Sequence, residues 1–202
     1  MSRLICITGG IGSGKSVVAQ LIRILGYHVY DCDARAKWLM EHDRQLRSDL
    51  VRLFGPETYL SHPDLHEVRL NRPYLSSHIF ANADALNQMN AAVHPAVARD
   101  LRQQQLSSGD DTFFFESAIL YESNFDRLVH PDQVWTVSAP LEMRIFRAMQ
   151  RDNTTREKVL NRIMSQLPQD EKERRASHVI VNDDRHSLIR QVTTLLSFQN
   201  HP

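Results

Sequence analysis

The sequence predicts an α/β fold: a parallel five-stranded sheet flanked by helices. Short apolar segments rich in β-branched or aromatic residues alternate with segments of helical periodicity, an order typical of parallel strands joined by helical crossovers. We expect the strands at residues 4–8, 28–30, 112–116, 134–138 and 178–182. With 202 residues, 42% of them hydrophobic, the chain can bury one substantial core.

The N-terminal part of the chain predicts a βαβ unit. After the first expected strand, a helix should begin at Lys15 or Ser16 and end at Leu25, because Gly26 can adopt the positive φ that closes a helix. The strand at residues 28–30 follows at once, so two short strands flank one helix.

Residues 33–109 predict a helical insertion with little strand signal. One helix should open at Asn71 or Arg72 with Pro73 in its first turn, and another at His94 with Pro95, since proline is favoured in the first turn of a helix. We expect a loop at residues 55–65, which contain two prolines.

A second helical stretch, residues 140–176, is rich in arginine and should break at residues 152–154 and at Pro168. It contains Arg144, Arg147, Arg151, Arg156, Arg162, Arg174 and Arg175. For most of these arginines the favoured interpretation is a solvated helix face with i,i+4 ion pairs, such as Glu171 with Arg175.

Composition and charge narrow the classes of function. Lysine plus arginine (24) balances aspartate plus glutamate (24), so no field of one sign attracts nucleic acid or an anionic membrane. No run of 18 apolar residues occurs, and we expect a soluble, cytoplasmic protein with no nucleic-acid or membrane partner. Cys6 and Cys32 are too few for a disulfide framework or a zinc site, so we interpret both as packing residues.

Residues 9–16, here called the phosphate loop, carry the strongest motif. They read Gly-Gly-Ile-Gly-Ser-Gly-Lys-Ser, which fits Gly-x-x-x-x-Gly-Lys-Ser after a strand and before a helix. Glycines let consecutive N–H groups turn toward a phosphate in dihedral angles that a Cβ would forbid, and the helix N-terminus adds partial positive charge. The alternative is a chance glycine-rich turn, which composition allows about once in a hundred such chains.

The phosphate loop predicts a nucleoside triphosphate site with Mg²⁺. The residues expected to bind the nucleotide are Gly10, Ile11, Gly12, Ser13, Gly14, Lys15, Ser16 and Val17. Lys15 should reach the β- and γ-phosphates, and the Ser16 hydroxyl should ligate Mg²⁺, which prefers oxygen ligands. The Asn-Lys-x-Asp or Thr-Lys-x-Asp motif that reads guanine is absent, which favours ATP. GTPases, ATPases and kinases share the loop, so the reaction stays open at this point.

Carboxylates end two of the expected strands. Asp31 and Asp33 follow the second strand and Glu116 ends the third, at the edge where ligands bind in open α/β sheets. The aspartates are candidates for the base that a kinase needs to accept a proton from the acceptor hydroxyl. The alternatives are a helix cap or turn residue for Asp31 and a first-turn acid for Asp33. Glu116 could hold a metal-bound water, although an ordinary strand-end carboxylate is favoured over a direct metal ligand.

Several separated segments together resemble the dephospho-CoA kinase family in order and spacing. The phosphate loop preceded by Thr8 is similar to that family's form of the loop, and Asp31-Cys32-Asp33-Ala34 resembles its Asp-x-Asp segment. Residues 118–122 resemble its Pro-Leu-Leu-Phe-Glu segment, and residues 147–152 resemble its arginine lid. Residues 75–80, 86–95, 162–166 and 176–182 continue the likeness, which covers most of the chain.

The resemblance implies transfer of a phosphoryl group from ATP to the 3′-hydroxyl of dephospho-CoA, the last step of coenzyme A synthesis. It implies Asp33 as general base and Arg147 and Arg151, four residues apart, as lid cations that act beside Lys15. It implies acceptor contacts from Thr8, Asp33, His94 and Glu122. Without the resemblance, His94 is better explained as a helix cap before Pro95, and Glu122 as a solvated acid.

The resemblance also implies a division of the chain. The core would comprise residues 1–32, 110–140 and 177–202, the acceptor-binding lobe residues 33–109, and the lid residues 141–176. We expect a monomer or weak homo-oligomer whose partners are ATP and dephospho-CoA. The alternatives are a kinase of another small metabolite or of nucleoside monophosphates, and a nucleotide-dependent regulatory switch.

The sequence departs from the family pattern at three places. Ala118 stands where proline is expected, Glu116 stands where aspartate is commoner, and Asp183 and Asp184 follow Asn182 without the usual glycine. The first two positions border the expected acceptor and metal sites. The third lies in the loop expected on the adenine side of the nucleotide.

Overall fold

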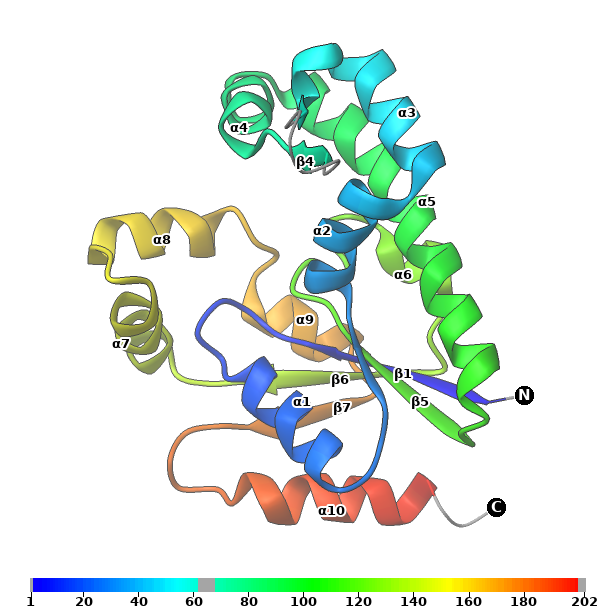
Figure 1. The fold of residues 1–202 in the computed structure, drawn as a ribbon. Coiled ribbons are helices and arrows are strands. Elements are labelled where there is room, and N and C mark those ends of the chain that lie inside the picture. The colour runs from blue at the N-terminus through cyan, green and yellow to red at the C-terminus, as the bar shows by residue number, and fades with distance from the viewer. Residues whose placement is uncertain (1, 62–67, 200–202) are drawn as a thin grey trace. The chain divides into compact units, whose positions relative to one another are not determined.

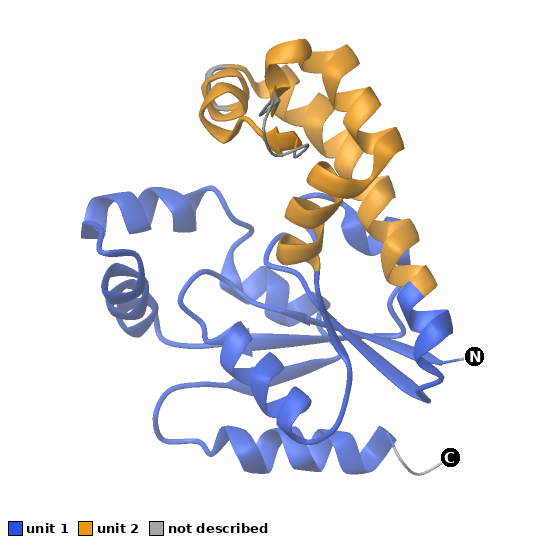
Figure 2. Cartoon of the chain, in the orientation of Figure 1, with its two compact units in different colours: residues 1–31, 104–202 blue, residues 32–103 orange. Residues whose placement is uncertain are grey.

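The chain folds into two compact units. The structure, a computed structural model, describes residues 2–61 and 68–199 (Figure 1). One unit comprises Met1–Asp31 and Gln104–Pro202, and the other comprises Cys32–Gln103 (Figure 2). The chain therefore leaves the first unit once and returns to it once.

The first unit contains the predicted parallel five-stranded sheet. Its strands are β1 (Arg3–Thr8), β2 (Val29–Asp31), β5 (Thr112–Glu116), β6 (Gln133–Ser138) and β7 (His178–Val181). They lie in the order β2-β5-β1-β6-β7, and every neighbouring pair is parallel. Each predicted strand is confirmed to within one residue at either end. All five residues of β5 are buried, as expected for a strand covered on both faces.

Helices cover both faces of this sheet. The helices of the first unit are α1 (Lys15–Ile24), α6 (Phe125–Val129), α7 (Leu141–Asp152), α8 (Arg156–Met164), α9 (Gln169–Arg175) and α10 (Leu188–Gln199). Helices α1 and α10 lie on one face and α9 lies on the other (Figure 1). Side chains such as Ile5, Phe114 and Val137 of the sheet pack with Ile22 of α1 and Val192 of α10 in one core.

These helices begin and end largely at the predicted residues. Helix α1 begins at Lys15 and is closed by Leu25, and Gly26 follows with φ of 94°. The arginine-rich stretch breaks after Asp152, where Asn153 adopts φ of 45°, and again before α9, which Pro168 precedes.

The second unit is mainly helical. Its elements are α2 (Cys32–His42), α3 (Arg44–Phe54), the 3₁₀ helix η1 (Pro56–Thr58), β3 (Tyr59–Ser61), β4 (Val68–Leu70), α4 (Arg72–Ala81) and most of α5 (Ala83–Ser108). Helix α4 has Asn71 as its N-cap and Pro73 in its first turn, as predicted. The predicted loop at residues 55–65 is wrong for residues 56–61, which form η1 and a strand paired antiparallel with β4; residues 62–65 lie outside the described residues.

The predicted helix start at His94 is also wrong. Helix α5 runs unbroken from Ala83 to Ser108 with Pro95 inside it. Proline removes one N–H donor from a helix interior, but the side chains of Val93, Val97 and Leu101 are buried on this helix, so packing outweighs the loss. Among the described residues, no helix combines the length and apolar character needed to cross a bilayer.

Candidate active site

The phosphate loop joins β1 to α1, and two of its glycines are required by both conformation and space. Gly12 and Gly14 adopt φ of 75° and 93°, a region that disfavours a Cβ. A Cβ on Gly12 would lie 2.1 Å from the carbonyl oxygen of Arg144, and one on Gly14 would lie 2.0 Å from Nδ2 of Asn182. The loop can therefore follow this path only with glycine at these positions.

Lys15 and Ser16 both contact Glu116 at the carboxyl end of β5. The Lys15 ammonium forms an ion pair with Glu116 Oε1, and Ser16 Oγ donates a hydrogen bond of 2.8 Å to the same oxygen. Glu116 lies beside Ile7 in the parallel register of β1 and β5. The serine hydroxyl and the carboxylate are adjacent oxygen donors, which suits Mg²⁺ coordination. Glu116 is therefore not an isolated strand-end carboxylate, because it is bound to both Lys15 and Ser16.

The first half of the phosphate loop is bound by side chains from residues 141–176. Arg144 Nε donates to the carbonyl oxygen of Ile11 at 3.1 Å, and the Ile11 N–H donates to Gln166 Oε1 at 2.9 Å. The Gly10 N–H donates to Gln169 Oε1 at 3.3 Å. Only 5% of Arg144 is exposed, so for this arginine the favoured interpretation as a solvated residue is wrong. For Arg175, which is exposed and pairs with Glu171, that interpretation is confirmed.

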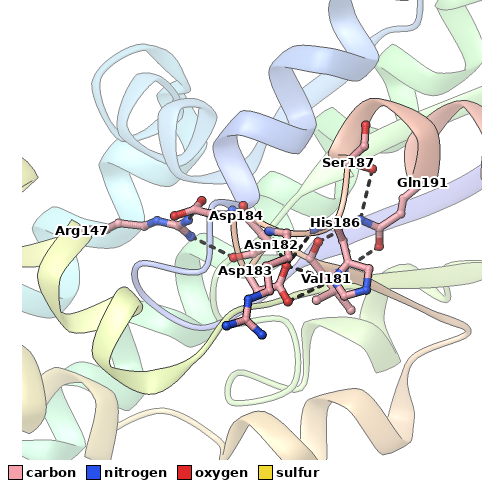
Figure 3. Close-up of polar contacts among 9 residues, drawn as sticks. Arg147, Val181, Asn182, Asp183, Asp184, His186, Ser187 and Gln191 are labelled. Atoms are coloured by element: carbon pink, nitrogen blue, oxygen red, sulfur yellow. Dashed lines mark hydrogen bonds and ion pairs between the residues drawn. The ribbon is translucent and has the colours of Figure 1, made fainter.

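The loop after β7 supports the second half of the phosphate loop. Asn182 Nδ2 donates to the carbonyl oxygen of Ser13 at 2.8 Å. Arg147 donates to the carbonyl oxygen of Asn182 at 3.2 Å and pairs with Asp184 at 2.7 Å (Figure 3). Asp184 adopts φ of 62°, the left-handed conformation that a glycine would supply and that aspartate tolerates. The loop therefore adopts a positive φ at this position without a glycine.

Asp183 ties the same loop to the residues that follow it. Its Oδ1 accepts hydrogen bonds of 3.0 Å from the backbone N–H groups of Arg185 and His186, and its carboxylate contacts the His186 ring. These contacts lower the pKa of Asp183 to about 2, with the side-chain bond to His186 the largest cause.

Glu122 belongs to a buried ion pair with Lys172 of α9. The Lys172 Nζ lies 2.7 Å from Glu122 Oε1 and 3.3 Å from the carbonyl oxygen of Ala118, and the Leu167 N–H donates to Glu122 Oε1 at 3.0 Å. None of the Lys172 side chain is exposed. Burial lowers the pKa of Lys172 and the Glu122 carboxylate opposes that shift. The interpretation of Glu122 as a solvated acid is therefore wrong.

Comparison with known proteins identifies the family. A model of the dephospho-CoA kinase family matches residues 3–187. The chain belongs to the dephospho-CoA kinase family. It is 40% identical over 200 residues to a dephospho-CoA kinase of Bacteroides fragilis, covering 98% of this chain and 93% of that protein. It is 39% identical over 191 residues to one of Porphyromonas gingivalis, covering 94% and 91%.

A solved structure extends this likeness to the whole fold. The crystal structure of TT1252 from Thermus thermophilus superposes with a TM-score of 0.85 at 33% identity, covering 100% of this chain and 99% of that one. The predicted parallel-sheet fold and the resemblance to the dephospho-CoA kinase family are thus confirmed.

The residues predicted for this kinase family do not all gather in one place. Lys15, Ser16 and Glu116 meet at the end of β5, as described. Arg147 reaches the loop after β7, whereas Arg151 binds the adjacent Asp152 through two bonds of 2.8 and 3.0 Å. Asp152 also pairs with Arg162, so Arg151 belongs to a surface ion-pair group.

Three further predicted site residues lie in the first unit, and they differ in burial. Thr8 and Ser13 are fully buried, and their hydroxyl oxygens have no hydrogen-bond partner among the described residues. Val17, in the first turn of α1, is 52% exposed. The roles predicted for these residues stay predictions.

Asp33 and His94 belong to the second unit. Asp33 is the second residue of α2, in its acidic first turn. His94 lies in the interior of α5, so the helix-cap explanation is wrong, and burial lowers its pKa. Their roles as base and acceptor contact likewise stay predictions.

Sequence reasoning missed four residues that support the site of this kinase: Arg144, Gln166, Gln169 and Lys172. Lys172 lies in Gln169–Arg175, a helix whose residues are all polar or charged, so nothing local marks it as buried. Asn182 could have been singled out, because it directly follows β7 at the same sheet edge that directed attention to Asp31 and Glu116.

Proposed function

We propose that this chain transfers the γ-phosphoryl group of ATP to the 3′-hydroxyl of dephospho-CoA, giving coenzyme A and ADP. The observation that carries the nucleotide part is the convergence of Lys15 and Ser16 on one oxygen of Glu116 beneath the phosphate loop. Membership of the dephospho-CoA kinase family supports the acceptor.

In this proposal Lys15 binds the β- and γ-phosphates and stabilises the charge of the transferring group. Ser16 and Glu116 are the oxygen donors that would hold Mg²⁺, which when bound supplies positive charge to the phosphates. Arg147 and Arg151 would act as lid cations, since a guanidinium makes bidentate contacts with phosphate oxygens. To contact phosphate, Arg151 would have to break its ion pair with Asp152.

Asp33 is the proposed general base. The oxygen of the 3′-hydroxyl forms a bond to the γ-phosphorus, the bond from that phosphorus to ADP breaks, and the hydroxyl proton passes to the Asp33 carboxylate. Support comes from the chain path: Asp31 lies in register with Glu116 across β2 and β5, and Asp33 follows Asp31 by two residues. Thr8, His94 and Glu122 are the proposed acceptor contacts.

An acceptor panel tests the substrate. Purified protein with ATP and Mg²⁺ should phosphorylate dephospho-CoA and leave nucleoside monophosphates and shikimate unmodified. Transfer to a nucleoside monophosphate but not to dephospho-CoA would refute the assignment. Slow ATP hydrolysis that no acceptor accelerates would favour the regulatory switch instead.

A substitution tests the base. Asp33→Asn should leave the affinity for ATP nearly unchanged and lower the turnover number by about 10²- to 10⁴-fold, the usual contribution of a general base. Asp31→Asn tests the other candidate base and should lower the turnover number much less than Asp33→Asn. Equal turnover by the wild type and Asp33→Asn would remove Asp33 from the mechanism.

The remaining parts of the proposal concern the metal, the roles of two segments of the chain, the cellular location and the oligomeric state. Mg²⁺ chelation should abolish transfer, and Mg²⁺ should restore it. We propose that residues 33–109 bind the acceptor, that residues 141–176 form the lid, and that the enzyme acts in the cytoplasm as a monomer or weak homo-oligomer. Light scattering of the purified chain measures its oligomeric state.

A further inference from the structure

Both backbone polar groups of Ile11 in the phosphate loop are bound by side chains that lie far along the chain. Its N–H donates to Gln166 at 2.9 Å, and its carbonyl oxygen accepts from Arg144 at 3.1 Å. Arg144 lies on α7 and Gln166 follows α8. The Ile11 peptide is therefore held on both sides by the segment that contains these two helices.

The side chain of Ile11 is attached to the same segment. Helices α7 and α8, here called the α7–α8 hairpin, enclose a small apolar cluster of their own around Ile145, Ala148 and Val159, each at most 1% exposed. Ile11 packs against this cluster together with Met149, Leu160 and Ile163 of the hairpin. Ile11 is the member of that set that comes from the phosphate loop, so apolar packing and hydrogen bonds act at one residue.

The second half of the phosphate loop is anchored differently. The Ser13 carbonyl oxygen is bound by Asn182, which follows β7, and Lys15 and Ser16 contact Glu116 of β5. That half is fixed to the ends of sheet strands, whereas Ile11 is bound by the hairpin and the linker after it, and Gly10 is bound by Gln169 at the start of α9. The two halves of the phosphate loop are therefore anchored to different parts of the first unit.

We propose that Ile11 is a positioning residue that couples the phosphate loop to the α7–α8 hairpin, so that the path of the first half of the loop depends on the packing of the hairpin against it. The inference rests on the proposed ATP-dependent transfer and extends it. Nucleotide binding and hairpin order become one equilibrium, because a ligand that fixes the loop also favours the packed hairpin.

The test compares Ile11→Ala with Met164→Ala, a control truncation of an exposed side chain at the end of α8. Amide hydrogen exchange is measured with and without a non-hydrolysable ATP analogue and Mg²⁺. In the wild type and the control, the analogue should slow exchange in both the phosphate loop and α8. In Ile11→Ala, it should slow exchange in the phosphate loop but no longer in α8.

Kinetics give a second readout that a purely structural role would not move. Ile11→Ala should lower kcat/KM for ATP about fivefold to tenfold, as expected when roughly half the burial of three methylene-sized groups is lost. It should also raise the share of ATP hydrolysed without transfer, since the hairpin no longer closes with the loop. Retained protection of α8 with an unchanged share of hydrolysis would overturn the proposal, as would tighter binding of the analogue.

A milder pair of substitutions keeps the test valid if Ile11→Ala does not fold. Ile11→Val and Val159→Ala, alone and combined, should change the affinity for the analogue non-additively, by more than about twofold, because Ile11 packs against the cluster that contains Val159 and neighbouring residues couple. Additive changes would overturn the proposal. These binding measurements need no acceptor, so a wild type that fails to phosphorylate dephospho-CoA but shows the coupling would refute the proposed acceptor and leave this inference standing.

Discussion

Replacing Lys172 with methionine should show how much the buried ion pair between Lys172 and Glu122 contributes to the free energy of unfolding. Methionine is similar in length and carries no charge, so Lys172→Met fills most of the same space. It removes the ammonium group 2.7 Å from Glu122 Oε1. Glu122 would keep the hydrogen bond from Leu167, while its Oε2 is buried and has no partner among the described residues. A carboxylate would thus be left without its counter-charge.

The size of the effect follows from that environment. Removing one partner of a buried ion pair costs about 3–5 kcal/mol. The Glu122 side chain is 17% exposed and keeps one donor, so we expect the lower limit, about 3 kcal/mol, in the free energy of unfolding. For a chain of this length, that corresponds to a fall in Tm of about 6–12 °C. Lys172→Met/Glu122→Gln should recover most of the loss, because burial of the Lys172 charge is itself unfavourable.

Thermal and denaturant unfolding measure this. Lys158→Met, at an exposed position of α8, is the control and should stay within about 0.5 kcal/mol of the wild type. Equal midpoints for the wild type and Lys172→Met, or no recovery in the double variant, would contradict this reasoning.

Three further predictions concern the strand ends. Asp184→Gly should stay within about 1 kcal/mol of the wild type in unfolding, whereas Asp184→Val should lose about 1–3 kcal/mol to strain at positive φ. The Asp183 carboxyl should titrate by NMR with a pKa of about 2. Its stabilisation of the loop is fully present above pH 3.8, the ordinary pKa of an aspartate, and is lost as the pH falls through about 2. His186→Ala should raise the pKa of Asp183. Glu116→Gln should raise the Mg²⁺ concentration for half-maximal transfer about tenfold, and an unchanged requirement would exclude Glu116 from metal binding.

Local sequence patterns were sufficient to predict the sheet and the positive φ angles of the phosphate loop. The three phenylalanines at 113–115 form an apolar run that only a strand covered on both faces explains, and the glycines at 12 and 14 mark positive φ. The same local rules failed at Pro95, where burial of the flanking valines outweighed the preference of proline for a first turn. They were silent on Arg144 and Lys172, because burial of a charged residue depends on neighbours that are remote in sequence.

The insertion of the second unit between β2 and β5 has a consequence for how acceptor recognition can evolve. The phosphate loop, Glu116 and Asn182 all belong to the first unit, and the segment between Asp31 and Gln104 is one uninterrupted stretch of chain. Its flanking strands are direct neighbours in the sheet. Under the proposal that residues 33–109 bind the acceptor, exchange of that single stretch would change acceptor contacts such as His94, while the parallel pairing and the phosphate loop would be inherited intact.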